Sequence, residues 1–285
     1  MKHLTGKYAV ITGGTDGIGA ATARAMRDRG AEVVIIGRSP AKAASMEKEP
    51  ALNGGSLRAL TADFSSMTQV RSVVRQLAEN HRHIDFLVHA VGILITKAQY
   101  TDEGLEKDFA VSYLSRYVFL EEAAALGLIG PATRMVNIAA SAPEVPRYAR
   151  MEFDDLGAVR ARTGMKAHGQ AQLANDLLTA QAADRYGITA VGYGPGAVNT
   201  SIRREVPKIL QAVMKPFYAR ATRQPQDVAA DLLALLVDEP TPLSSTTFAN
   251  RNGRFAPSAY LADPHRQADL LSISEALARQ AAQRG

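Results

Sequence analysis

One glycine-rich segment of this chain reads Thr12-Gly13-Gly14-Thr15-Asp16-Gly17-Ile18-Gly19. It follows a short apolar run at residues 8–11 and precedes an alanine-rich helical pattern at residues 20–29. A strand that turns on glycines into a helix points backbone N–H groups and the positive end of the helix dipole outward, and this geometry binds phosphate. The segment therefore predicts a nucleotide site, with an ordinary glycine-rich turn as the alternative.

The three glycines that frame the turn have separate expected roles. Their spacing is G-x-x-x-G-x-G instead of the more common G-x-G-x-x-G. We expect Gly13 to form the tight turn, Gly17 to let a pyrophosphate approach the backbone, and Gly19 to let helix and strand pack closely. In a strand–helix–strand unit, the phosphate at such a turn usually belongs to a dinucleotide.

Strand-like and helix-like segments alternate along the chain. Apolar runs lie at residues 8–11, 33–36, 57–61, 84–89, 135–139 and 188–193, and helical patterns lie at 17–29, 40–48, 66–80, 101–126 and 166–185. This alternation predicts an α/β fold of the Rossmann type, with a doubly wound parallel sheet in a three-layer αβα arrangement, as a single domain over residues 1–285. Ligands of such sheets bind outside the carboxyl ends of the strands.

Two segments interrupt the alternation. Residues 141–165 form a long insertion between a strand and the next helix, and residues 197–224 follow the Pro195-Gly196 break. Both leave the carboxyl ends of central strands, where a substrate would lie. We therefore expect them to be substrate-pocket or lid segments of a small-molecule site.

The composition limits the classes of protein. The 285 residues are 46% apolar and include no cysteine, so a sizeable core is expected, and disulfides and thiolate metal sites are excluded. The net charge of +5 is spread along the chain without a nucleic-acid-binding motif, which favours a solvated basic surface and no nucleic-acid partner. We find no signal peptide and no apolar run long enough to span a membrane, and with the lack of cysteine this predicts a cytoplasmic location.

Taken together, these segments resemble the short-chain dehydrogenase/reductase family over the whole chain. The match is carried by residues 12–19, by Asp63-Phe64-Ser65 after the third strand, and by residues 195–200. Within the family, residues 153–156 and 166–175 are similar to the FDDL and KAYGQSKLAN motifs of the retinol-dehydrogenase-like branch. The resemblance implies a dehydrogenase or reductase that uses a nicotinamide dinucleotide.

The same alignment shows a departure at the family's catalytic tetrad. His168 stands at the place of the catalytic Tyr and Gln172 at that of the Lys four residues later, while Ala140 and Ser112 replace the Ser and the Asn. In the family, the Tyr exchanges a proton with the substrate oxygen, and the Lys ammonium lowers the pKa of the phenol. The resemblance therefore implies that ordinary carbonyl–alcohol chemistry has been abandoned or rebuilt in this chain.

Histidine can transfer a proton without a neighbouring cation, because imidazole titrates at about pH 6.5 by itself. We therefore predict His168 as the catalytic residue, with Gln172 one helical turn away; the alternative is a polar filler beside the pocket. Ser141, one place beyond the lost Ser, is a further candidate for orienting a substrate, with a turn-capping serine as the alternative. Reduction of C=N or C=C bonds could instead proceed without a protein acid.

Arg38 indicates which nicotinamide cofactor is expected. It follows the second strand, about 20 residues beyond the glycines, where an acid would bind a ribose 2′-hydroxyl and an arginine accommodates a 2′-phosphate. NADP(H) is therefore the predicted cofactor, with an exposed loop arginine as the alternative. The residues predicted to hold it are Gly13, Thr15, Asp16, Gly17, Ile18, Gly19, Arg38, Ser39, Asp63, Phe64, Ala90, Gly92, Gln172, Pro195, Gly196, Val198 and Thr200.

Three hypotheses about function follow. The first is an NADP(H)-dependent reductase of C=N, C=C or C=O bonds in a small or medium organic molecule, without the usual Ser-Tyr-Lys acid. The second is a non-redox cyclase, isomerase or lyase that binds NADP structurally, and the third is a catalytically silent nucleotide-sensing partner. The resemblance also implies a homodimer or homotetramer formed through the helices near residues 112–125 and 168–182.

Overall fold

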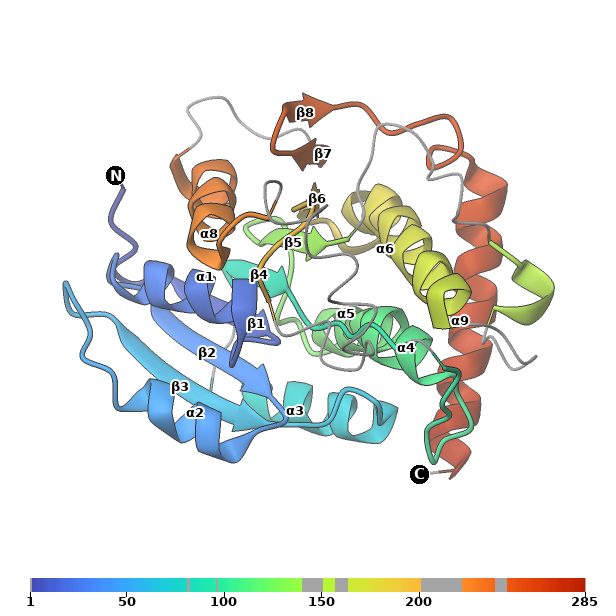
Figure 1. Ribbon diagram of the computed structural model, residues 1–285, viewed down its shortest axis with the longest axis horizontal. Coiled ribbons are helices and arrows are strands. Elements are labelled where there is room, and N and C mark those ends of the chain that lie inside the picture. The colour runs from blue at the N-terminus through green and yellow to red at the C-terminus, as the bar shows by residue number, and fades with distance from the viewer. Residues whose placement is uncertain are drawn as a thin grey trace.

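Eight strands form one sheet in the order β3-β2-β1-β4-β5-β6-β7-β8 in the computed structural model, which describes residues 2–80, 83–95, 97–139, 151–156, 164–200, 222–238 and 245–284 (Figure 1). The strands are β1 Tyr8–Thr12, β2 Glu32–Gly37, β3 Ser56–Thr61, β4 Phe86–His89, β5 Arg134–Ile138, β6 Thr189–Gly194, β7 Thr246–Asn250 and β8 Gly253–Phe255. Neighbours from β3 to β7 pair in parallel, and β8 pairs antiparallel with β7. The predicted parallel sheet is confirmed, but the sequence pattern missed the parallel strand β7 and the antiparallel edge strand β8.

Helices cover both faces of the sheet. They are α1 Gly17–Arg27, α2 Pro40–Glu47, α3 Met67–Asn80, α4 Lys107–Phe109, α5 Ser115–Ala125, α6 Gly164–Tyr186, α8 Pro225–Leu233 and α9 Pro264–Arg284, with a π-helical turn at Ala110–Leu114 that joins α4 to α5. One apolar core lies between the sheet and α1 and α8, and the other lies between the sheet and α3, α5 and α6. The domain is therefore a three-layer α/β fold of the Rossmann type.

Alternate residues of the central strands face the two cores. Val10 and Val34 belong to the core beneath α3, α5 and α6, whereas Ile11 and Ile35 belong to the core beneath α1 and α8. All four side chains are completely buried. Because helices cover both faces, the strands read as continuous apolar runs instead of alternating ones.

The order of the strands places a crevice at the boundary between β1 and β4. The chain winds from β1 outward to β2 and β3, and it then returns to β4 on the other side of β1. The connections that leave the carboxyl ends of β1 and β4 therefore diverge, and this is where doubly wound sheets bind their ligands.

The first helical turn of the predicted helix over 101–126 is absent, and the helix begins at Lys107. Residues 101–104 form a hydrogen-bonded turn in which the amide of Gly104 donates to the carbonyl of Thr101 over 2.8 Å. Glu106 then caps the helix, because its Oε2 accepts from the amide of Phe109 over 2.8 Å.

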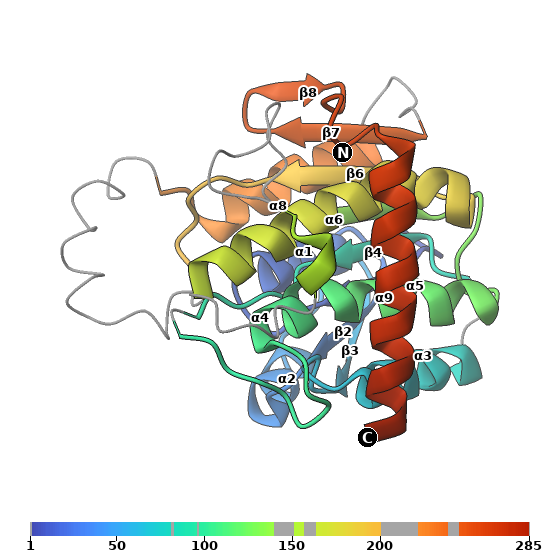
Figure 2. The ribbon, with the colours of Figure 1, turned by 90° about the vertical axis from the view of Figure 1, so that its right-hand side faces the viewer.

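The C-terminal helix α9 was not predicted from the sequence. Figure 2 shows it running across the outside of the layer that contains α6, α5 and α3. A buried contact of 2.7 Å joins the hydroxyl groups of Tyr113 and Ser274, and Arg71 donates to the carbonyl of Ala278 over 3.3 Å. Self-association through residues 112–125 and 168–182 would therefore have to use the parts of α5 and α6 that α9 leaves uncovered.

Candidate active site

The glycine-rich segment forms the turn between β1 and α1. Gly13 has a φ of +70° and Gly17 a φ of +52°, a region that residues with a Cβ atom rarely adopt. A Cβ atom at Gly13 would lie 2.7 Å from the backbone nitrogen of Val91, and one at Gly17 would lie 3.0 Å from Cγ2 of Thr200. The turn is therefore packed tightly against the loops that follow β4 and β6.

Asp16 is the N-cap of α1. Its Oδ1 accepts from the amide of Gly17 over 2.8 Å, and its Oδ2 forms an ion pair with Lys42. The amides of Ile18 and Gly19, in the first turn of the helix, have no acceptor within the helix. Because these N–H groups lie at the positive end of the helix dipole, they fit a phosphate group.

Arg38 and Ser39 follow the carboxyl end of β2. The Arg38 side chain is exposed, and within the described residues it forms no ion pair or hydrogen bond. The hydroxyl of Ser39 caps α2 by accepting from the amide of Lys42 over 3.4 Å. An exposed arginine at this edge of the sheet fits a cofactor phosphate.

Asp63 and Phe64 follow the carboxyl end of β3. The Oδ1 of Asp63 accepts from the amide of Ser65 over 2.9 Å, so it closes a local turn. Phe64 is buried in the apolar core. The Asp63 carboxylate and the backbone, and not the Phe64 ring, are therefore the parts of this segment that can face a cofactor.

The remaining predicted cofactor residues follow β4 and β6. Ala90 and Gly92 are half-buried in the β4 loop. Val198 forms an isolated parallel bridge with Arg223, which fixes the start of the β6 loop, and Thr200 faces the glycine turn. The structure therefore gathers the predicted cofactor residues of the β1, β2, β3, β4 and β6 loops at the carboxyl edge of one sheet, namely Gly13, Thr15, Asp16, Gly17, Ile18, Gly19, Arg38, Ser39, Asp63, Ala90, Gly92, Pro195, Gly196, Val198 and Thr200.

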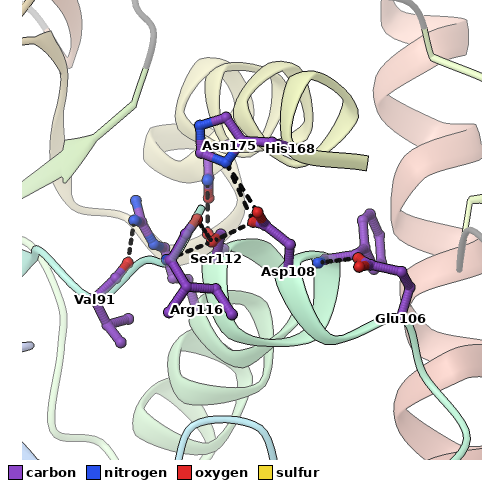
Figure 3. Close-up of polar contacts among 9 residues, drawn as sticks. Val91, Glu106, Asp108, Ser112, Arg116, His168 and Asn175 are labelled. Atoms are coloured by element: carbon purple, nitrogen blue, oxygen red, sulfur yellow. Dashed lines mark hydrogen bonds and ion pairs between the residues drawn. The ribbon is translucent and has the colours of Figure 1, made fainter. Parts of the chain in front are cut away.

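His168 lies in the first turns of α6 and contacts a carboxylate that sequence reasoning missed. Its Nδ1 lies 3.1 Å from Oδ2 and 3.3 Å from Oδ1 of Asp108 (Figure 3). Asp108 is completely buried, whereas the His168 side chain keeps 20% of its surface exposed. An ionised carboxylate can only accept, so the Nδ1 of His168 is the donor and its Nε2 is the nitrogen that can exchange a proton with a substrate.

Ser112 connects this pair to the loop that follows β4. Its hydroxyl donates to Oδ1 of Asp108 over 2.7 Å and accepts from the amide of Ile93 over 3.2 Å. Ser112 lies in the π-helical turn, and its carbonyl accepts from the Asn175 side chain over 2.7 Å. A continuous path of hydrogen bonds therefore runs from the predicted cofactor loop through Ser112 and Asp108 to His168.

Gln172 is half-buried, one turn along α6 from His168. Its side chain forms no hydrogen bond within the described residues, so its amide is available to a ligand. Ser141 and Ala140 lie outside the described residues, as do most of residues 141–165 and 197–224. The predicted roles of Ser141 and of the two lid segments stay predictions.

Arg116 is a second residue that the sequence did not single out. It lies one turn beyond Ser112 and is only 2% exposed. Its guanidinium donates to the carbonyl of Val91 over 2.5 Å (Figure 3). It also donates to the carbonyl of Ile138 over 2.7 Å and to Oδ1 of Asn137. Burial lowers the pKa of Arg116 to about 9, and the side chain is therefore still charged at neutral pH.

Three other residues with proton-donating groups have partners elsewhere. His89 Nδ1 lies 3.2 Å from the hydroxyl of Thr12, and burial, together with the charge of Arg116, holds its pKa well below the usual range. Tyr113 pairs with Ser274 beneath α9. The hydroxyl of Tyr193 donates to Asp231. Among these and His168, His168 is therefore the one that combines a partly exposed side chain with an orienting carboxylate.

The chain belongs to the short-chain dehydrogenase family, because the family model described as short chain dehydrogenase matches residues 7–152. Retinol dehydrogenase 12 of Mus musculus is 28% identical over 259 residues, which are 87% of this chain and 79% of that protein. The polyprenol dehydrogenase of Homo sapiens is 30% identical over 212 residues, which are 70% of this chain and 63% of that protein. The relatives agree with the resemblance to the retinol-dehydrogenase-like branch and indicate that the chain is an oxidoreductase.

The solved structures agree on the fold. The Pseudomonas aeruginosa RhlG/NADP active-site complex superimposes with a TM-score of 0.64 at 22% identity, over 87% of this chain and 96% of that one. Within the described residues of this chain, no helix has the length and apolar content needed to cross a membrane. The same residues contain no group of three His, Cys, Asp or Glu side chains that could hold a metal ion.

Proposed function

We propose that this protein is an NADP(H)-dependent reductase that uses His168 as its proton donor. The observation that carries the proposal is the 3.1 Å contact between His168 Nδ1 and Asp108 Oδ2, at the helix position where the family resemblance calls for a catalytic Tyr. The pair is connected through Ser112 to the loop after β4, where the cofactor is expected. A proton donor and a cofactor loop in one hydrogen-bonded unit are what reduction of a polar bond requires.

NADP(H) is the cofactor that the exposed residues of the site favour. The 2′-phosphate of NADP(H) would meet Arg38, whose side chain has no partner within the described residues. The amides of Ile18 and Gly19 would hold the pyrophosphate, and Gln172 would reach the nicotinamide ribose. When bound, this cofactor supplies the hydride.

His168 and Asp108 then handle the proton. Asp108 accepts from Nδ1, which holds the imidazole in one tautomer and stabilises its protonated form. Nε2 of the protonated ring can donate to the substrate oxygen or nitrogen as the hydride arrives at the neighbouring carbon. Ser112 donates to the other carboxylate oxygen, so the negative charge of Asp108 stays fixed while the proton moves.

The substrate class follows from the relatives and from the donor. Two relatives are named for retinol and polyprenol, which are isoprenoid alcohols. Their oxidised forms are conjugated carbonyl compounds, and an imidazolium donor suits the C=O bond as well as a C=N bond. We therefore propose a small or medium apolar molecule with a conjugated C=O, C=N or C=C bond as substrate.

Turnover with a panel of imines, enones and ketones tests this proposal. We expect NADPH consumption with at least one class and a loss of about 10²-fold or more in the His168→Ala variant. The matched control is His265→Ala, because His265 is exposed on α9. If NADPH binds and no class of substrate consumes it, the proposal is wrong.

A second candidate function uses the same pair as a general base. A carboxylate that holds an imidazole is also suited to removing a proton next to a carbonyl, as in an isomerase or lyase, with NADP bound structurally. A product with the mass of the substrate, formed without cofactor consumption, would favour it.

A catalytically silent nucleotide sensor is the third candidate, and it predicts that His168→Ala changes no reaction. A cytoplasmic location and self-association as a homodimer or homotetramer stay predictions.

A further inference from the structure

Arg116 is a buried charge for which the proposed function has no role. Its guanidinium donates to three uncharged acceptors, the carbonyls of Val91 and Ile138 and the side chain of Asn137. Within the described residues it forms no ion pair with a carboxylate, and Asp176 acts on it through a longer-range attraction. Burying an arginine whose hydrogen bonds go to uncharged acceptors is costly, so its charge needs an explanation beyond holding two loops together.

The position of Arg116 relates it to one end of the expected cofactor. Val91 lies between Ala90 and Gly92 at the carboxyl end of β4, and Ile138 is the last residue of β5. The predicted adenosine contacts follow β2 and β3, and the phosphate-binding turn follows β1. A dinucleotide bound along this edge in the strand order β3-β2-β1-β4-β5 would bring its nicotinamide end toward the loops that Arg116 binds.

The nicotinamide ring changes charge when it reacts. It is neutral in the reduced cofactor and carries a positive charge in the oxidised one. A fixed cation in a buried site raises the free energy of the charged ring and leaves that of the neutral ring almost unchanged. The low dielectric of the interior makes this effect larger than it would be in water.

We infer that Arg116 makes the site bind NADPH more tightly than NADP⁺. This inference rests on the proposed function, because it requires that a nicotinamide cofactor binds at this edge. The Arg116 side chain does not take part in proton transfer. It acts as a fixed charge, and its hydrogen bonds to Val91 and Ile138 hold that charge in place.

Equilibrium titrations with NADPH and with NADP⁺ test the inference through the ratio of the two dissociation constants. We expect the wild-type protein to favour NADPH, and Arg116→Gln, which keeps a hydrogen-bond donor and loses the charge, to reduce this preference roughly tenfold. Arg116→Lys keeps the charge and should keep most of the preference. Arg134→Gln is the matched control, because Arg134 is an exposed arginine at the amino end of β5, and its loss should leave the ratio unchanged.

The outcomes separate a role of the charge from a structural role. If Arg116→Gln weakens both nucleotides by the same factor, the residue only supports the loops and the inference is wrong. If Arg116→Gln does not fold, the ratio of the NADPH and NADP⁺ dissociation constants of the wild-type protein decides. Equal or tighter binding of NADP⁺ by the wild-type protein overturns the inference. Loss of the NADPH preference in Arg116→Lys overturns it as well. If the wild-type protein binds neither nucleotide, the proposed function itself fails.

Discussion

His168 Nδ1 lies 3.1 Å from Oδ2 of Asp108, although 60 residues of chain separate the two side chains. Asp108 lies in α4, which continues through the π-helical turn into α5, and His168 lies in the first turns of α6. The carboxylate is completely buried and also accepts from Ser112. The imidazole is therefore held by a fixed negative group, an arrangement that differs from the phenol and ammonium pair of the family resemblance.

Replacing His168 should separate chemistry from cofactor binding. Because its Nε2 is the proposed proton donor, we expect His168→Ala and His168→Gln to lower the turnover rate by about 10²- to 10⁴-fold. Calorimetric titration should give an unchanged NADPH affinity, since the cofactor phosphates are held by other loops. A large loss of NADPH affinity in both variants would mean that His168 has a binding role instead.

Replacing Asp108 tests whether it orients the imidazole. Asp108→Asn keeps the shape of the side chain but can present an N–H to Nδ1, which reverses the preferred tautomer. We expect kcat to fall by about 10²-fold or more while KM changes little. The matched control is Glu106→Gln, another buried carboxylate two residues away, which should leave kcat nearly unchanged. Equal losses in the two variants would contradict a positioning role.

Glu106 should make stability depend on pH. It is completely buried, and its Oε1 has no hydrogen-bond partner among the residues that the structure describes. Burial raises the pKa of Glu106 above its ordinary value of 4.5, so its contribution to stability is full below that value and is lost as pH rises through the raised pKa in the folded protein. We expect the wild-type protein to lose more free energy of unfolding than Glu106→Gln between about pH 4 and about pH 7. Urea denaturation at several pH values in this range measures the free energy of unfolding of each protein. If this free energy changes with pH by the same amount in the wild-type protein and in Glu106→Gln, Glu106 is not the source of the pH dependence.

The hydrogen bond between Tyr113 and Ser274 should contribute to holding α9. Both hydroxyl groups are buried, so removing one leaves the other without a partner. We expect Tyr113→Phe to lower the free energy of unfolding by about 1–2 kcal/mol. Tyr117→Phe is the matched control on the same helix, because the described residues give its hydroxyl no hydrogen bond, and it should cost less than about 0.5 kcal/mol. Equal losses of unfolding free energy in the two variants would show that the Tyr113–Ser274 hydrogen bond does not stabilise the fold.

The sequence predicts the fold well because the decisive signals are local. The apolar runs and the glycines at 13, 17 and 19 specify strands and a turn within a few residues, and the structure has β1 and α1 at these places. Strands β7 and β8 and helices α8 and α9 were missed because their apolar residues pack on elements that are distant in the sequence.

The chemistry of the site was predicted only in part because it depends on contacts between distant residues. His168 could be found by aligning it with a motif, whereas Asp108 and Arg116 occupy no motif that the sequence offered. The signal that could have found Asp108 is its place one helical turn before Ser112, which puts both on the same face of a helix. Arg116 lies one turn after Ser112, and on sequence alone it resembles a solvated arginine.

The central claim is that the site binds NADP(H) and recognises its 2′-phosphate through Arg38. Fluorescence titration of the purified protein with NADPH and with NADH tests this claim most directly. We expect NADPH to bind at least about tenfold more tightly than NADH, and Arg38→Ala to remove most of that difference by weakening NADPH alone. Failure of both nucleotides to bind would contradict the account and would make the glycine turn a feature of the fold without a cofactor.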